Sequence, residues 1–389
     1  MRAVARIVLV FCYVCFIAIL SGRDRVWAQG GALPIRIGAF LSVIGDGAYV
    51  GAPQLATLQL YVELINKQGG VLNRPLELVY YDVGIDTKTA QTAVRRLIDQ
   101  DQVDVIIGGS TTGAAMAVLP IVEQAQIPFI ALAGSGALVS PVYPWVFKAS
   151  PTDRIACAKI FEDMQKRGIS RIALITGDSG FAVSMKEQCA NVATDYGVAF
   201  VASQTYPSQT RRVNEPLQRL AGVPGIQAVL AIDFGSAPPY LVQAYRKSGF
   251  KVPLYQTHAQ VSEDFIDLAG DAAEGVRMPV PLLTVAAELP DGDPHRRILR
   301  AYIDAYKRKW DIAPNFYGAY AHDALLMVVG AIVRAGNADN INVRDAIEQT
   351  DGFVGASGTY RMSEQDHMGL DLSSFRMAEI KGGTWVLIE

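Results

Sequence analysis

The residues with the most distinctive chemistry in this chain are hydroxyl side chains at the end of a predicted strand. Residues 106–113 read Ile-Ile-Gly-Gly-Ser-Thr-Thr-Gly, so an apolar strand ends in Ser110, Thr111 and Thr112 just before a predicted helix. Free backbone N–H groups and hydroxyls then lie at the carboxyl edge of a parallel sheet, where open α/β folds bind their ligands. This arrangement favours an anion. Capping of the helix by one of the three hydroxyls, with no ligand, is the alternative interpretation.

A second turn of small residues follows the next predicted strand. It reads Ala133-Gly134-Ser135-Gly136. Because the two strands are close in sheet order, we expect this turn to share one ligand pocket with the first.

Two further motifs suggest cofactor or catalytic chemistry that the rest of the chain does not support. Gly45, Gly47 and Gly51 resemble a dinucleotide fingerprint with one extra residue. Asp82, at the end of the next strand, lies too far along to bind a ribose, so we interpret the glycines as a turn that brings backbone close to another ligand. Residues 177–180 spell the Gly-Asp-Ser-Gly of trypsin-like proteases, but that fold is all β. We therefore expect that the protein is not an enzyme and that it has no cofactor and no metal site.

The elements that position these residues alternate between strand and helix. In the first part of the chain, strands are predicted at 35–40, 76–81, 103–107, 128–131 and 145–149, and helices at 55–65, 87–98 and 114–124. Such alternation predicts a parallel sheet covered by helices on both faces.

The same rhythm begins again after Pro151. Strands are predicted at 171–176, 198–206, 228–232 and 252–255, with helices before, between and after them. The chain is therefore expected to form two doubly wound α/β lobes. Residues 275–283, two long helices at 297–310 and 319–335, and a β-like tail from 353 are expected to cross between the lobes and form a hinge. We predict a first lobe of 29–150 with 282–354, and a second lobe of 151–281 with 355–389.

Charge and size limit the possible partners. The formal net charge is −3, and it becomes −6 when Arg2, Arg6, Arg23, Arg25 and Asp24 are removed with the N-terminal segment, because 31 basic residues then face 37 acidic ones. A mildly acidic chain has no basic stripe to neutralise phosphates, so nucleic acid and anionic membranes are poor candidate partners.

The N-terminal segment predicts export. Arg2 and Arg6 precede an apolar run at 7–20, and Ala28 ends the segment with a small residue, so residues 1–28 are predicted to be a cleavable signal peptide and the site of action the periplasm. The run is shorter than the roughly 20 residues that a spanning helix needs, which makes a retained anchor the weaker alternative. Cys12 and Cys15 would be lost on cleavage.

Two cysteines remain after export. Cys157 and Cys189 are predicted on helices that flank one strand. In an oxidising compartment they could form a disulfide that closes a loop of roughly 30 residues, worth about 3 kcal/mol in the chain-entropy model. A pair of free, buried thiols is the alternative.

Several fragments, in order and spacing, resemble the periplasmic solute-binding proteins of branched-chain amino acid type ABC importers, which have the type I periplasmic-binding fold. They include Ile35-Arg36-Ile37-Gly38, Ile65-Asn66-Lys67-Gln68-Gly69-Gly70, Asp104-Val105-Ile106-Ile107-Gly108, Ile127-Pro128-Phe129-Ile130, Lys166-Arg167-Gly168, Ala273-Glu274-Gly275-Val276 and Val343-Arg344-Asp345-Ala346-Ile347. The resemblance covers essentially all of the mature chain. It implies a protein without catalysis whose two lobes close on one small ligand and deliver it to a membrane permease.

The resemblance also implies a ligand site. Thr112 matches the hydroxyl residue that binds the ligand carboxylate, with help from Thr111 and the turn of Ala133, Gly134 and Ser135. Phe181 matches an aromatic residue of the second lobe that covers the ligand.

Two parts of this site depart from the family pattern. His258 stands where amino-acid-binding members place a carboxylate for the α-ammonium, and an imidazole cannot supply that ion pair. Around Tyr49, the first glycine turn has Ile44, Asp46 and Val50 in place of the usual hydroxyl, proline and aromatic residues. We therefore expect α-amino acids to be poor ligands, although Asp233 near the end of a second-lobe strand is an alternative source of the charge.

The leading hypothesis is an exported, monomeric binding component for uptake of a small carboxylate-bearing solute, either a branched-chain amino acid or an aromatic or other hydrophobic acid. A ligand sensor of the same fold, acting through a separate signalling partner, is the strongest alternative.

Overall fold

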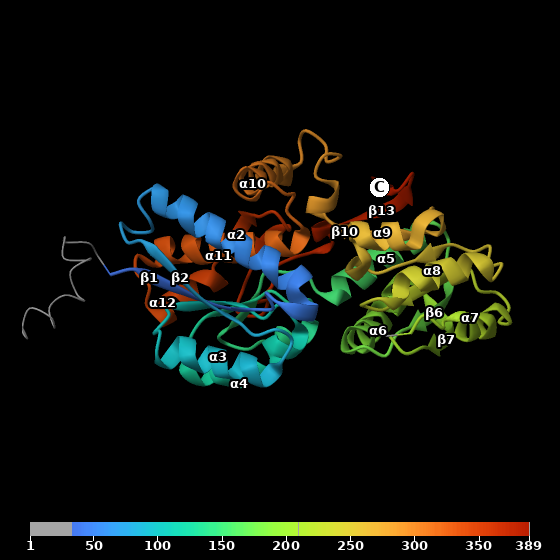
Figure 1. Cartoon of the computed structure of the whole chain (residues 1–389), viewed down its shortest axis with the longest axis horizontal. Coiled ribbons are helices and arrows are strands. Elements are labelled where there is room, and N and C mark those ends of the chain that lie inside the picture. The colour runs from blue at the N-terminus through green and yellow to red at the C-terminus, as the bar shows by residue number, and fades with distance from the viewer. Residues whose placement is uncertain (1–32, 209, 389) are drawn as a thin grey trace, which may run out of the picture.

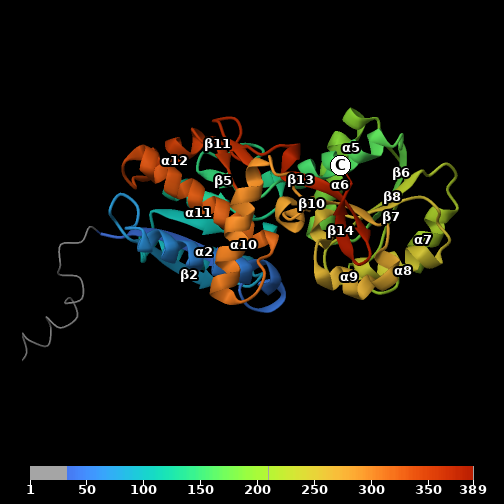
Figure 2. The same ribbon diagram turned by 90° about the horizontal axis from the view of Figure 1, so that it is seen from above.

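The computed structural model describes residues 33–208 and 210–388, which fold into two α/β lobes side by side (Figure 1). The predicted signal peptide and its cleavage site lie outside the described residues. In Figure 2 the strands β10 (Arg277–Pro281) and β13 (Phe375–Lys381) lie where the two lobes meet. They are antiparallel, so β10 leads the chain from the second lobe toward the first and β13 leads it back. The two lobes are therefore joined by more than one segment of chain.

The first lobe contains a five-stranded sheet in the order β2-β1-β3-β4-β5, with every neighbouring pair parallel. The central strand β3 (Val105–Gly108) is buried at all four residues, which agrees with its continuous apolar sequence. The other strands are β1 (Ile35–Leu41), β2 (Leu76–Asp82), β4 (Phe129–Ala131) and β5 (Val146–Lys148).

Helices cover both faces of this sheet, as predicted. In Figure 1, α2 (Ala48–Lys67) and α11 (Phe316–Ala335) lie above it, and α3 (Thr87–Asp99) and α4 (Thr112–Ala125) lie below. The helices α10 (Pro294–Trp310) and α12 (Asn340–Glu348) and the two-stranded sheet of β11 (Asp351–Val354) and β12 (Thr359–Arg361) complete the first lobe. Among the described helices, α11 alone is long and apolar enough to span a membrane, and most of it is buried in the lobe.

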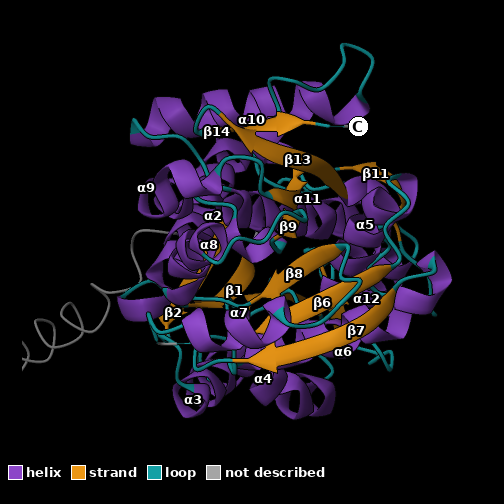
Figure 3. Cartoon of the chain, turned by 90° about the vertical axis from the view of Figure 1, so that its right-hand side faces the viewer, coloured by secondary structure: helices purple, strands orange, loops and turns teal. Residues whose placement is uncertain are grey.

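The second lobe contains a seven-stranded sheet in the order β14-β13-β10-β9-β8-β6-β7. The strands from β7 to β10 are parallel, whereas β13 and β14 run antiparallel at one edge. Three of the parallel strands are seen side by side in Figure 3. The remaining elements are β6 (Arg171–Thr176), β7 (Ala199–Thr205), β8 (Ala228–Ile232), β9 (Leu254–Tyr255), β14 (Thr384–Leu387), α5 (Asp153–Lys166), α6 (Gly180–Ala193), α7 (Asn214–Ala221), α8 (Ala237–Lys247) and α9 (Glu263–Ala269).

A disulfide joins α5 to α6 within the second lobe. Cys157 and Cys189 are both fully buried, and their Cα atoms are 5.1 Å apart. Of the two alternatives that the sequence left open, the structure has the disulfide and not the free thiols.

The segment that follows β11 is attached to the first lobe by a buried carboxylate. Asp323 of α11 accepts hydrogen bonds from the backbone N–H groups of Ala356 and Ser357, both at 2.7 Å. A side chain at Gly355 would come within 2.5 Å of the same carboxyl group, so this close approach requires glycine. The Tyr360 hydroxyl lies 3.0 Å from Asp323 Oδ2.

The chain stays packed against the first lobe up to about residue 370. His367 stacks on Phe147 of β5 with ring centroids 4.2 Å apart, and its carbonyl oxygen accepts a hydrogen bond from the Lys148 N–H. We therefore propose that the third crossing lies between residues 370 and 375, later than the boundary expected at 354 and 355.

A ligand-binding cleft between the lobes

The hydroxyl residues at the end of β3 have three different roles in the structure. Ser110 is buried; its Oγ accepts a hydrogen bond from the Ser42 N–H and donates one to Gln54 Oε1 at 2.6 Å. Thr111 is the N-cap of α4, and its hydroxyl oxygen accepts from the Ala114 N–H at 3.3 Å. Thr112 is exposed and, within the described part of the chain, its hydroxyl has no hydrogen-bond partner. Helix capping therefore explains the hydroxyl of Thr111, and buried hydrogen bonds within the lobe explain that of Ser110. Thr112 keeps a free hydroxyl at the N-terminus of α4.

The second predicted turn lies directly after the neighbouring strand β4. Ser135 caps a short 3-10 helix, where its oxygen accepts from the Ala137 N–H at 3.3 Å and its hydroxyl proton stays available. The carbonyl oxygen of Ala133 accepts from the Ser150 hydroxyl. A Cβ atom on Gly134 would lie 3.1 Å from Asp153 Oδ1, so the turn packs against the start of α5 in the second lobe.

Asp153 belongs to a buried group of charges at the first crossing between the lobes. Lys148, at the end of β5, has no exposed surface, and its Nζ donates to Ser150 Oγ at 2.6 Å and to the Pro151 carbonyl oxygen at 3.1 Å. Burial lowers the pKa of Lys148 and raises the pKa of Asp153, and each charge partly offsets the shift of the other. Asp153 Oδ1 has no hydrogen-bond donor among the described residues.

His258 lies beside this group, at the start of a short 3-10 helix after β9. Its Nε2 is 3.6 Å from Asp153 Oδ1, and its Nδ1 has no partner in the described chain. Burial, aided by the positive charge of Lys148, lowers the pKa of His258 to about 3. The ring is therefore neutral near pH 7, and its contact with Asp153 is not an ion pair.

Aromatic rings from both lobes meet next to His258. The Phe181 ring of α6 lies 5.9 Å from the His258 ring and 5.9 Å from the Phe234 ring. Phe234 in turn lies 5.6 Å from Tyr49 of α2, which belongs to the other lobe. The contact between Tyr49 and Phe234 therefore bridges the cleft.

Asp233, next to Phe234, has a role within the second lobe. It is 1% exposed, and its Oδ1 accepts hydrogen bonds from the hydroxyls of Ser208 and Ser179 at 2.7 and 3.0 Å. These bonds fix the turn at 177–179, which contains most of the protease-like sequence Gly-Asp-Ser-Gly at 177–180. The motif therefore has a structural role: its Ser179 side chain helps to hold this loop against Asp233.

The structure connects several of the predicted site residues. Gly134 and His258 both approach Asp153, and Phe181 and Tyr49 both contact Phe234. Sequence analysis missed Lys148, Asp153 and Phe234. Phe234 had a usable signal, since it follows the carboxyl end of a parallel strand, but nothing local distinguishes the buried Lys148 and Asp153 from surface charges.

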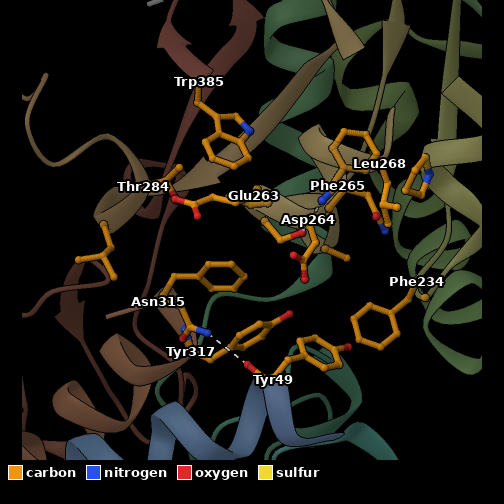
Figure 4. A pocket seen from close by; sticks show the side chains of 18 of the residues that line it. Tyr49, Phe234, Glu263, Asp264, Phe265, Leu268, Thr284, Asn315, Tyr317 and Trp385 are labelled. Atoms are coloured by element: carbon orange, nitrogen blue, oxygen red, sulfur yellow. Dashed lines mark hydrogen bonds between the residues drawn. The ribbon is translucent and has the colours of Figure 1, made fainter. Parts of the chain in front are cut away.

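A pocket of about 720 Å³ opens beside this aromatic contact (Figure 4). Tyr49 is the one residue of the predicted site that lines it, together with Phe234, the start of α9 and the loop before α11. Within residues 33–208 and 210–388, no three His, Cys, Asp or Glu side chains are placed to hold a metal ion.

Comparison with solved structures identifies the architecture. An extracellular ligand-binding receptor from Rhodopseudomonas palustris HaA2 superposes with a TM-score of 0.81 at 26% identity, covering 91% of this chain and 99% of the other. A type 1 periplasmic binding protein from Bordetella pertussis gives a TM-score of 0.79 at 21% identity, covering 91% of this chain and 99% of that chain. The predicted type I periplasmic-binding fold is confirmed.

Sequence comparison leads to the same family. The chain is 25% identical over 351 residues to a Leu/Ile/Val-binding protein homolog of Brucella abortus, covering 83% of this chain and 84% of the relative. Relatives and structural neighbours of this kind are substrate-binding proteins and not enzymes, as predicted. The family model described as periplasmic binding protein matches residues 34–384. This chain belongs to the periplasmic binding protein family.

Proposed function

We propose that this protein is the exported binding component of an ABC importer and that it captures a small carboxylate-bearing organic solute between its two lobes. The family supports the binding role, and relatives of ABC transport systems support a permease as the partner. We expect the protein to act as a monomer in the periplasm. A sensor role remains the alternative function, and genes for a permease and an ATPase beside its own gene would favour uptake.

The carboxylate of the ligand binds at the first lobe. The N-terminus of α4 offers backbone N–H groups and the partner-free hydroxyl of Thr112, and the Ser135 hydroxyl still has a proton to donate. Charge-assisted hydrogen bonds from such groups favour an anion.

The opposite end of the ligand carries no ammonium group. The observation that supports this is the neutral, buried His258, which cannot pair with a cation. Enclosing an unpaired ammonium group costs several kcal/mol of binding free energy. A ligand hydroxyl can instead hydrogen-bond to the neutral imidazole, and an aromatic ring of the ligand can pack against the neighbouring aromatic rings. Hydrophobic, keto or aromatic acids are therefore preferred over α-amino acids.

An amino acid is the second candidate ligand, and one observation favours it. Asp153 Oδ1 is buried, lies next to His258 and lacks a donor, so it is a possible partner for an ammonium. Lys148 already compensates its charge, which is why we rank acids first. A relative from Pseudomonas aeruginosa, 22% identical over 80% of this chain and 82% of its own length, is named as binding leucine, isoleucine, valine, threonine and alanine.

Calorimetry on refolded, ligand-free protein separates the two ligand classes. Benzoate-like acids and 2-keto acids are compared with leucine, isoleucine and valine, for wild type and for Asp153→Asn. We expect the acids to bind and the amino acids to bind weakly. Micromolar binding of leucine that is lost in Asp153→Asn, together with no binding of the acids, would establish the amino acid instead.

A further inference from the structure

The pocket beside the Tyr49 and Phe234 contact has walls from both lobes. Tyr49 and the loop at 313–317 come from the first lobe, the start of α9 and Trp385 of β14 come from the second, and Thr284 follows the crossing at β10. At about 720 Å³ it is large enough for a small organic molecule. Figure 4 shows the space between Trp385 above and Tyr317 and Tyr49 below.

Aromatic rings supply much of the lining. They are Tyr49, Phe234, Phe265, Phe316, Tyr317 and Trp385. Ring faces attract organic cations through their quadrupole, most strongly for Trp and Tyr.

The charged groups of the lining are all negative. Glu263 and Asp264 extend into the pocket in Figure 4, and no Lys, Arg or His is among the lining residues that the structure describes. Neither carboxylate forms an ion pair with any residue in 33–208 or 210–388. Capping does not explain them, because Ser262 already caps α9 by accepting from the Phe265 N–H at 3.2 Å. The two carboxylates therefore face the pocket without a counter-charge.

A buried amide adds an acceptor to the same wall. Gln260 is 4% exposed, and its Nε2 donates to the carbonyl oxygen of Asp233 at 2.9 Å. This bond leaves Oε1 as an acceptor with no donor among the described residues. The amide oxygen of Gln260, two carboxylates and several ring faces offer acceptors and negative charge to a cation, and the lining offers no positive charge to an anion.

We propose that this pocket is a binding site for a small organic cation of the alkylammonium class. Thr112 and Ser135 do not line this pocket, and Tyr49 is the one residue that it shares with the predicted acid site, so the proposal does not depend on the acid assigned to the two turns. Because its walls belong to both lobes, an occupant contacts the two lobes together and stabilises the arrangement in which they are close.

Choline and its uncharged isostere 3,3-dimethylbutan-1-ol test this proposal by calorimetry on the whole protein. We expect choline to bind, and the isostere to bind at least about tenfold more weakly, because the two molecules have the same shape but only choline carries a positive charge. Choline binding is expected to weaken by about tenfold in the double variant Glu263→Gln, Asp264→Asn, and to stay unchanged in Asp267→Asn, an exposed acid on the same helix that does not line the pocket.

Failure of this proposal is distinguishable from failure of the proposed function. Thr112→Val is expected to leave choline binding unchanged, and the double variant is expected to keep its affinity for the acid. Thermal unfolding of the double variant checks its fold. No choline binding at millimolar concentration, equal binding of choline and its isostere, or full binding by the double variant would each overturn the cation site.

Discussion

Burial determines the protonation state of His258. Its side chain is almost fully enclosed, and this burial, with a smaller effect of the positive charge of Lys148, lowers its pKa to about 3. In the unfolded chain a histidine takes up its proton near pH 6.5. Between these values the unfolded state binds more protons than the folded state, so stability is fully present above pH 6.5 and is lost as the pH falls toward 3.

His258→Asn is therefore expected to be less sensitive to acid than wild type. At pH 4.5 the wild-type protein loses up to about 3 kcal/mol through this residue, and the variant does not. The raised pKa of Asp153 acts with the opposite sign in this range, but it is common to both proteins. Urea unfolding at pH 4.5, 5.5 and 7 measures the difference. Parallel stability curves for the two proteins would contradict the assignment.

Thr112→Val tests the carboxylate site. Valine keeps the shape of threonine and removes the hydroxyl, so the affinity for the acid is expected to fall by about 1.5 to 3 kcal/mol, the range for a hydrogen bond to a charged group. Thr92→Val, an exposed threonine on neighbouring α3, serves as the control and is expected to bind normally. Unchanged calorimetric affinity of Thr112→Val for the true ligand would remove Thr112 from the site.

The disulfide acts at the scale of two helices. It joins α5 to α6 across a sequence separation of 32 residues. In the chain-entropy model a loop of this length contributes about 3 to 4 kcal/mol by restricting the unfolded state. The double variant Cys157→Ala, Cys189→Ala is expected to lose stability of that order. Denaturant unfolding with and without reductant checks this: reductant should leave the variant unchanged and bring wild type close to it. Equal stability of oxidised wild type and variant would refute the expectation.

Most regular elements could be predicted from the sequence because their periodicity is local. Strands β6 and β8 match their predicted bounds, and both consist largely of β-branched and apolar residues. The start of α2 was missed: it begins at Ala48, not near residue 55, because Gly51 and Pro53 lie in its first turns and two more glycines directly precede it, which obscures the pattern. Helix α9 was also missed, since seven residues are too few to establish a helical period.

The candidate site was less predictable than the fold. Hydroxyl residues at the ends of β3 and β4 are recognisable because they follow apolar strands directly. The group of Lys148, Asp153 and His258 was not, because residues more than 100 positions apart become buried together only when the two lobes assemble. The acceptor and donor roles of Thr111 and Ser110 also depend on contacts that sequence spacing does not define.

At the scale of the whole molecule, the proposed function depends on an equilibrium between separated and closed lobes. A ligand shifts that equilibrium only as far as its affinity differs between the two arrangements. The contact of Tyr49 with Phe234 joins the lobes and is lost when they separate. Aromatic pairs of this kind contribute about 0.5 to 1.5 kcal/mol beyond the area they bury.

Phe234→Ala is therefore expected to favour the open form in the absence of ligand and to weaken ligand binding by up to about tenfold, because closure then costs more free energy. Small-angle X-ray scattering should give a larger radius of gyration for the ligand-free variant than for wild type, and saturating ligand should bring the two values together. Tyr80→Ala, which removes a partly exposed ring from the edge strand β2 far from the cleft, should change neither quantity. If Phe234→Ala scattered like wild type without ligand and bound the ligand equally well, the ring contact would have no part in closure, and the lobes would be held together by the crossings alone.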